Sequence, residues 1–147
     1  MIDCMFKGVD KQTNYWVQGD VIRDPQSRLY IGQLDFTQSA SGPVVINPFI
    51  LHEIYPNTLS RNSEFKDMFD RYVFENDIFE MNQDLMTELW LPYPRCTIIV
   101  QDGCFFANCG DQLHYLHEFR DKKSNKLRGQ VLRTVFEPED AYKNHML

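Results

Sequence analysis

Residues 56–79 read PNTLSRNSEFKDMFDRYVFENDIF, and short β-like segments make up most of the chain on either side of them. The stretch begins as a polar segment and ends in an acidic loop, which is followed by the apolar triplet Tyr72-Val73-Phe74. Glu75-Asn76-Asp77 then separates this triplet from Ile78 and Phe79. A polar break inside an apolar strand is typical of a β-bulge or a tight bend. Because residues 56–72 are mostly polar, we expect them to form a linker. We expect Asp77 to accept hydrogen bonds from backbone N–H groups at the bend.

The residues before this stretch predict a hairpin and two further strands. Residues 15–17 and 21–22 form a β-rich run, and residues 29–36 form the returning strand after the turn sequence Asp24-Pro25-Gln26-Ser27. Residues 44–46 and 49–51 read as two separate short strands because Asn47-Pro48 lies between them.

The residues after it predict further strands and little helix. Asp102-Gly103 is a strong hairpin turn sequence between residues 97–100 and 104–107, and residues 113–116 and 131–136 are also strand-like. Residues 84–91 fit a helical turn or a loop, and the acidic sequence after Pro138 favours a short C-terminal helix from Ala141.

Many short strands with frequent turns predict a mainly β protein, in which antiparallel strands form one or two small barrel-like or sandwich units. We expect residues 1–147 to be a single compact domain, or two β units at about residues 5–56 and 72–137 joined by the 56–72 linker.

The composition limits the function and the location. The formal net charge is −6, which argues against a general nucleic-acid binder, because such proteins usually present a basic face. No apolar run is long enough to span a bilayer, and the start of the chain lacks the features of a signal peptide. We therefore expect a cytoplasmic protein with reduced, partly buried cysteines.

The central stretch resembles the YopX-like family of bacterial phage and prophage proteins. That family's pattern is Pro-x-Thr-Val-Gly-Gln-x-Thr-Gly-Leu-x-Asp-x-x-Gly-x-x-Ile-Tyr-Glu-Gly-Asp-Ile-Val. The matching positions, aligned without a gap, are Pro56, Thr58, Leu59, Asp67, Val73, Phe74, Glu75, Asp77 and Ile78. The family's opening is similar to Gly8-Val9-Asp10 followed by Trp16-Val17-x-Gly19, and its closing strand is similar to residues 131–139. The resemblance therefore touches about half of the chain. It implies a mainly β fold and a phage or mobile-element origin in a bacterial host, and no particular activity.

The chain departs from that pattern at three positions where the family usually has glycine, which are Glu64, Asp70 and Asn76 here. Glycine usually marks backbone with a positive φ, which Asn tolerates, Asp tolerates less well and Glu does not. We therefore expect a divergent member whose linker is rebuilt near Glu64.

Three groups of residues could carry chemistry, and each has a structural interpretation that we favour. The carboxylates Asp67, Asp70, Glu75 and Asp77 could perform acid–base catalysis, but they also suit hydrogen bonding around turns. Cys104, Cys109, His114 and His117 are ligand types without the Cys-x2-Cys spacing of common zinc sites, so we expect no metal and no other cofactor. No cysteine shows the local base partner that a thiol nucleophile requires.

The last group is basic and consists of Lys122, Lys123, Lys126 and Arg128. These residues could contact nucleic-acid phosphates, but a solvated loop is the interpretation that we favour. Trp16 and Trp90 could be interface anchors, with a core position favoured for Trp16.

We expect a non-enzymatic accessory protein that binds a protein partner or associates with itself as a homo-oligomer. One alternative is a nucleic-acid-associated protein that uses residues 122–128, which would have basic residues and exposed aromatics on one face. The other is an enzyme that uses residues 67–77, whose carboxylates would converge in a cleft.

Overall fold

The computed structural model describes residues 5–38 and 44–136. The chain divides into two compact units, Met1–Arg61 and Asn62–Leu147. The prediction of a mainly β, antiparallel protein is confirmed, and the strands of the described residues form two sheets that do not close into a barrel. The hydrogen-bonded strand orders are β4-β3-β2-β1-β5-β6 and β10-β9-β8-β7-β11.

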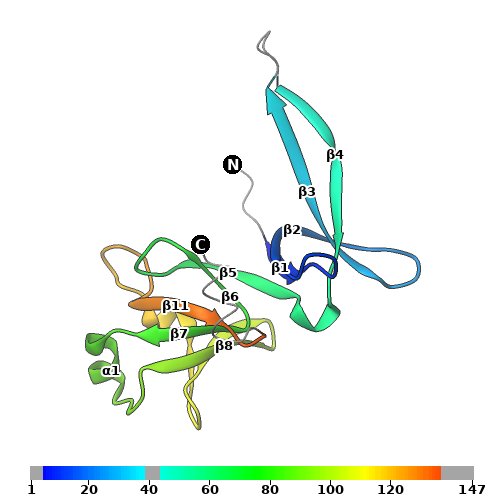
Figure 1. Ribbon diagram of the computed structural model, residues 1–147. Helices are drawn as coiled ribbons and strands as arrows, with labels where there is room; N and C mark the ends of the chain where they lie inside the picture. Colours follow the sequence, from blue (N-terminus) through cyan, green and yellow to red (C-terminus); the bar gives the residue numbers. More distant parts are fainter. Residues whose placement is uncertain (1–4, 39–43, 137–147) are drawn as a thin grey trace. The chain divides into compact units, whose positions relative to one another are not determined.

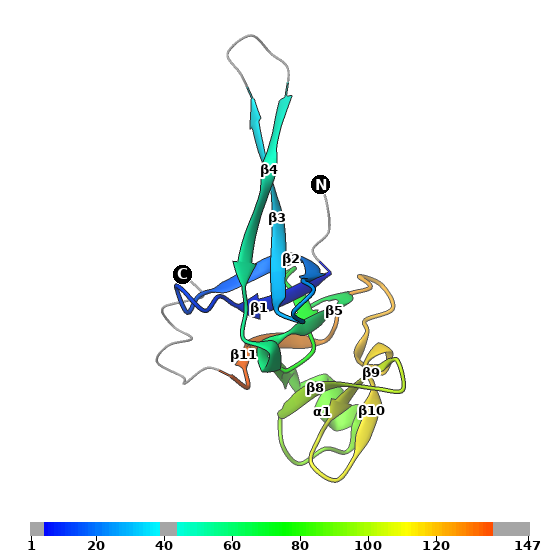
Figure 2. The ribbon, with the colours of Figure 1, turned by 90° about the vertical axis from the view of Figure 1, so that its right-hand side faces the viewer.

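The first unit is built from β1 (Phe6–Val9), β2 (Trp16–Arg23), β3 (Leu29–Gln38) and β4 (Val44–Glu53). The predicted β2–β3 hairpin is confirmed, with its turn at residues 24–27. Figures 1 and 2 show β3 and β4 as one long two-stranded ribbon. The segment after β4 returns to β1, because the Tyr55 N–H donates to the Val9 carbonyl at 3.0 Å. This arrangement encloses a small core of Leu29, Ile31 and Ile54.

The prediction of two separate strands around Asn47-Pro48 is wrong, since β4 runs through both residues. The register shifts there, so that Asn47 pairs with Asp35 and Ile50 pairs with Gln33. Pro48 has no backbone N–H to donate to the neighbouring strand. A bulge tolerates this, because it leaves a residue outside the ladder of hydrogen bonds.

The described residues of the second unit form one α-helix and most of the remaining strands: β6 (Tyr72–Phe74), β7 (Asp77–Met81), α1 (Gln83–Leu89), β8 (Arg95–Gln101), β9 (Cys104–Asn108), β10 (Leu113–Tyr115), the 3₁₀ helix η2 (Leu116–Phe119) and β11 (Gly129–Thr134). Asn82 begins α1 as its N-cap by accepting from the Leu85 N–H at 2.9 Å. The predicted turn at Asp102-Gly103 is confirmed, with φ of 53° and 78° at the two residues.

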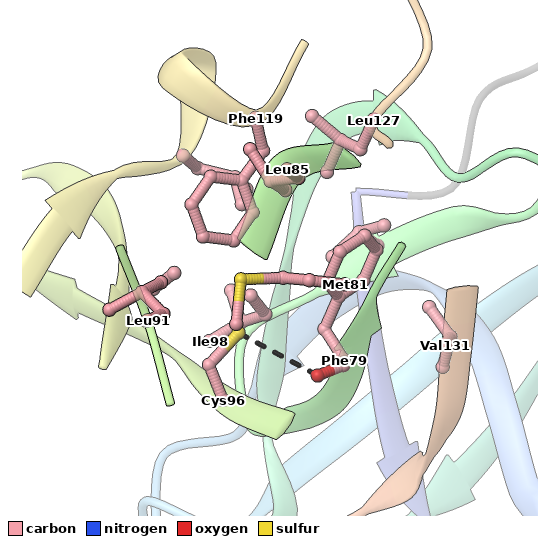
Figure 3. Close-up of a cluster of buried hydrophobic side chains, with 12 residues drawn as sticks. Phe79, Met81, Leu85, Leu91, Cys96, Ile98, Phe119, Leu127 and Val131 are labelled. Atoms are coloured by element: carbon pink, nitrogen blue, oxygen red, sulfur yellow. Dashed lines mark hydrogen bonds between the residues drawn. The ribbon is translucent and has the colours of Figure 1, made fainter. Parts of the chain in front are cut away.

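One face of the β7–β8 region carries the core of this unit. Alternate residues of β7 and β8 point inward, and α1, η2 and Leu127 cover them (Figure 3). The fully buried members of this core include Val73, Phe79, Leu85, Ile98 and Phe119. Burial of a large apolar side chain stabilises the fold by about 1.5–3 kcal/mol, so this cluster is the main apolar contribution to the second unit.

Residues 56–66 are mostly regular structure and residues 67–71 form a turn, so the segment predicted as a linker is not an unstructured connection. It contains the 3₁₀ helix η1 (Pro56–Thr58) and β5 (Ser60–Lys66). β5 spans the division between the units, since Ser60 and Arg61 pair with β1, whereas Asn62 and Lys66 pair with β6. The polar composition reflects side chains that hydrogen-bond to the backbone, which sequence alone does not distinguish from solvated side chains.

Glu64, Asp70 and Asn76 all adopt a left-handed backbone, with φ of 69°, 68° and 72°. The expectation that Glu64 does not tolerate a positive φ is therefore wrong. Its N–H donates to the Asn62 side-chain oxygen at 2.8 Å, and the next N–H donates to the Ser63 hydroxyl at 3.1 Å. These bonds offset the cost of about 1–2 kcal/mol that a side chain incurs in this conformation.

The tight bend at Asn76 and the structural position of Asp77 are confirmed. Residues 75–76 form a turn between β6 and β7, so the apolar triplet and Ile78-Phe79 belong to two strands rather than one bulged strand. Asp77 is fully buried, and its carboxylate accepts from the Phe74 N–H at 2.8 Å. The predicted helix from Ala141 lies outside the described residues.

We predict that Asp77→Ala lowers the free energy of unfolding by about 1.5–3 kcal/mol, the usual contribution of a hydrogen bond to a charged group. Asp77→Asn should cost less, because the amide oxygen still accepts from Phe74. Urea unfolding of both variants measures this, with Asp111→Ala as the matched control at an exposed carboxylate. Midpoints at or above that of the wild type in both Asp77 variants would show that this carboxylate does not stabilise the bend.

Candidate functional site

Asp67 is fully buried and accepts four hydrogen bonds within a tight turn and from β11. One carboxylate oxygen accepts from the Phe69 and Arg71 N–H groups at 2.9 and 3.0 Å. The other accepts from the Arg71 Nε at 3.1 Å and from the Val131 N–H at 2.9 Å. Both oxygens are therefore committed to holding backbone, and this carboxylate is structural.

The acidic stretch does not converge in a catalytic arrangement. Asp67 is bonded to Val131, whereas Asp77 lies beyond the opposite end of β6 and pairs with Thr134. Asp70 is exposed and forms long surface ion pairs of 3.8 and 3.6 Å with Lys66 and Lys126. The discriminating feature for an enzyme, carboxylates that share a cleft, is not found among these residues.

The other residues of the resemblance lie in the core or in turns, or hydrogen-bond to the backbone. Pro56 begins η1, and the Thr58 hydroxyl accepts from the Val9 N–H at 2.9 Å while donating to the Tyr55 carbonyl at 2.6 Å. Val73 and Phe74 are buried. Glu75 and Ile78 are half-buried, at the turn and on β7.

Two of the four predicted nucleic-acid contacts are engaged within the protein. Arg128 forms a 2.6 Å ion pair with Glu88 and donates to the Glu118 carbonyl at 3.0 Å. Lys126 faces Asp70, which leaves Lys122 and Lys123 as the exposed lysines of the loop. Two exposed lysines are a small basic surface on a chain of net charge −6, so the arrangement does not favour phosphate binding.

The four residues of zinc-ligand type, Cys104, Cys109, His114 and His117, do not form a metal-binding group. Cys104 and His117 are exposed, while His114 lies near the side chains of Glu118 and Gln112 at 3.2 and 3.1 Å. Within residues 5–38 and 44–136, no group of three or more His, Cys, Asp or Glu side chains could hold a metal ion.

The sequence reasoning missed the ion pair of Asp10 and His52. Asp10 is buried, and its carboxylate lies 2.7 Å from the His52 Nδ1. The Gln33 amide donates to the Gln18 carbonyl at 2.8 Å, which directs its oxygen toward the His52 Nε2 at 3.2 Å. The pair joins the residue after β1 to β4 across 42 residues, so no local pattern could identify it.

Among the described residues of the second unit, Trp90 and Tyr93 are the most exposed aromatic residues, with 90% and 74% of their surfaces exposed. Trp90 ends α1 in the left-handed conformation, with φ of 57°. A positive φ is an outlier for a bulky side chain, and glycine is the usual residue at this position of a helix. We call residues 90–94 the aromatic corner.

The aromatic corner is anchored at both ends. The Leu91 N–H donates to the Met86 carbonyl at 3.0 Å, and the Leu91 side chain is buried in the core. At the other end, the Pro94 carbonyl accepts from the Met81 N–H at 2.7 Å. Pro92 and Pro94 restrict the backbone between these anchors. The two aromatic rings are therefore presented to solvent by a segment with little freedom to withdraw them.

The comparisons with protein-family models, with curated proteins and with solved structures gave no match to this chain. In the part of the chain that the structure describes, no helix combines the length and apolar character needed to cross a membrane.

We predict that Asp67→Asn lowers the free energy of unfolding by about 1–3 kcal/mol, the usual cost of leaving a buried donor unsatisfied. Both oxygens of Asp67 face donors, so the new amide N–H₂ must oppose one of them. Asp70→Asn is the matched control and should change stability by less than about 1 kcal/mol, because its ion pairs are at the surface. Equal urea midpoints for the two variants would refute the structural assignment of Asp67.

The Asp10 carboxyl predicts a pH dependence of stability in the first unit. Burial acts to raise its pKa, but hydrogen bonds from the Gln12 N–H and from His52, with the charge of His52, lower the pKa below the ordinary 3.8. A lowered pKa stabilises the fold above about pH 4 and loses this contribution as the pH falls through the folded value. Asp10→Asn should therefore flatten the loss of stability between about pH 5 and 2.

The measurement is urea unfolding across this pH range, followed by the fluorescence of Trp16 in a Trp90→Phe background. Asp20→Asn, at an exposed position of the same unit, is the control and should keep the wild-type pH profile. An unchanged acid profile in Asp10→Asn would contradict the prediction.

Proposed function

We propose that this protein is a non-catalytic binding protein whose aromatic corner contacts another protein or a second copy of the chain. The observation that carries the proposal is Trp90, an exposed indole in a backbone conformation that a folding role would leave to glycine. An exposed indole is costly in water and valuable in an interface, where Trp and Tyr are enriched among the residues that contribute most affinity. Backbone strain of this kind concentrates at functional positions.

The electrostatics and the acidic stretch support binding over the alternatives. The buried carboxylates that could have suggested catalysis serve as acceptors for backbone N–H groups. The basic loop directs its arginine to Glu88 and to the carbonyls of residues 118 and 119. Neither set of residues therefore supports the enzyme or the nucleic-acid interpretation as strongly as the aromatic corner supports binding.

We also propose that the chain is a divergent relative of the YopX-like phage and prophage proteins, acting in the cytoplasm of a bacterial host. Support comes from three of the four positions at which that family's pattern has glycine, since Glu64, Asp70 and Asn76 adopt positive φ here, whereas the fourth, Ser60, does not. Further support comes from Thr58, Asp67 and Asp77, three polar positions of the pattern whose side chains hold backbone in this chain.

We predict that Trp90→Gly raises stability by about 1 kcal/mol, because glycine adopts the left-handed conformation without the steric cost. The same variant should lose binding, since it removes the exposed ring. Sedimentation velocity at tens of micromolar measures self-association, and capture from lysogenic host cells with mass spectrometry measures a heterologous partner. A gain in stability together with a loss of binding identifies Trp90 as a binding residue, because replacing a structural residue would lower stability.

Phe69→Ala is the matched control, because Phe69 is 60% exposed in the same unit but lies in a different turn. It should preserve both association and captured partners. If Trp90→Gly sediments as the wild type does and captures the same proteins, the aromatic corner is not the binding surface.

A further inference from the structure

Cys96 and Cys109 face each other across the β8–β9 hairpin. In its register, Ile98 pairs with Ala107 and Thr97 pairs with Asn108. The next step away from the turn places Cys96 opposite Cys109. Their side chains lie on the core-facing side, where Cys96 belongs to the buried cluster and Cys109 packs against it.

The hairpin makes this position geometrically suitable for a disulfide. Gln101 and Cys104 flank its two-residue turn and form a hydrogen-bonded pair, so alternation makes the Cys96–Cys109 position a non-hydrogen-bonded one. The Cys109 N–H accordingly points away from β8 and donates to the Gln112 carbonyl at 2.8 Å. The Cα atoms at such positions are about 4.5 Å apart, within the range of about 4.4–6.8 Å that disulfides span.

The two thiols differ in environment. Cys96 is 4% exposed and lies among apolar side chains (Figure 3), whereas Cys109 is half-buried. The Cys96 thiol donates to the Phe79 carbonyl at 3.7 Å. An interaction with the neighbouring Cys96 thiol lowers the pKa of the Cys109 thiol, although burial opposes this change. The interaction with Cys109, together with burial, raises the pKa of the Cys96 thiol. Cys109 is therefore the thiol that an external reagent meets first, and it is the better nucleophile.

We propose that Cys96 and Cys109 form a reversible redox pair, which a peroxide converts into an intramolecular disulfide. The Cys109 thiolate attacks one oxygen of the peroxide, the O–O bond breaks, and the departing hydroxide takes a proton to become water. Cys109 is now a sulfenic acid. The Cys96 sulfur attacks the Cys109 sulfur, and the displaced hydroxide leaves as water with the Cys96 proton.

The two steps convert two thiols and one hydrogen peroxide into one disulfide and two waters. The peroxide gains two electrons and each sulfur loses one. A dithiol reductant reverses the reaction by thiol–disulfide exchange. The product joins β8 directly to the end of β9, so it closes the open end of the hairpin. The competing interpretation is that both are unreactive buried thiols. In that case peroxide would form no disulfide between them, and the two cysteines would not differ in reactivity.

The experiment uses the full chain with Cys4→Ser and Cys104→Ser, so that only Cys96 and Cys109 remain. Native protein is treated with hydrogen peroxide and analysed by intact mass, thiol titration and peptide mapping. We expect both thiols to disappear, the monomer to lose two hydrogen atoms, and a peptide cross-linked from Cys96 to Cys109 to appear. Dithiothreitol should restore both thiols, and the oxidised form should have a higher urea midpoint.

Two single variants in this background test the assigned order. With Cys96→Ser, peroxide should leave Cys109 as a sulfenic acid that dimedone traps. With Cys109→Ser, native Cys96 should react much more slowly, because it is buried. The proposal is overturned if both thiols survive excess peroxide in the native protein, if the disulfide forms only between chains, or if the two single variants react at equal rates.

Discussion

The second unit depends on the carboxylate of Asp67. This carboxylate is fully buried and accepts hydrogen bonds from three backbone N–H groups and one guanidinium. A buried charge is tolerated only where donors replace its water, and these donors come from its own turn and from β11. The Arg71 guanidinium also donates to the Val131 carbonyl at 2.9 Å. One charge pair therefore fixes the turn after β5 and the position of β11 together. Displacement of either would leave the carboxylate short of donors.

The local part of this arrangement could be predicted from the sequence, and the distant part could not. The bend before Asp77 follows from a polar break in an apolar run, and the β8–β9 turn follows from Asp102-Gly103. The link from Asp67 to Val131 spans 64 residues, and the link from Asp10 to His52 spans 42. Contacts between residues so far apart in the sequence depend on the topology of the fold. Hydrophobic periodicity and secondary-structure propensity do not reveal that topology.

The left-handed residues show a second limit of sequence reasoning. Propensity predicts that Glu avoids a positive φ, yet Glu64 adopts one where Asn62 accepts from its N–H. A hydrogen bond of about 1 kcal/mol is comparable to the conformational cost, so the preference is overridden by a neighbour two residues away. Asp70 and Asn76 occupy the same conformation with side chains that tolerate it better.

Trp90 differs from these residues because the structure provides no compensation for its ring. The Trp90 N–H donates to the Met86 and Thr87 carbonyls at the end of α1, and any residue with a backbone N–H could make these bonds. The indole itself is 90% exposed, so it gains little packing within the chain. Conformational cost without internal packing is the combination expected where a side chain contributes to affinity rather than to folding. The sequence placed Trp90 only as one of two candidate anchors, because exposure depends on which face of the α1–β8 connection the core occupies. Leu91 fills the core, and the neighbouring ring is thereby directed outward.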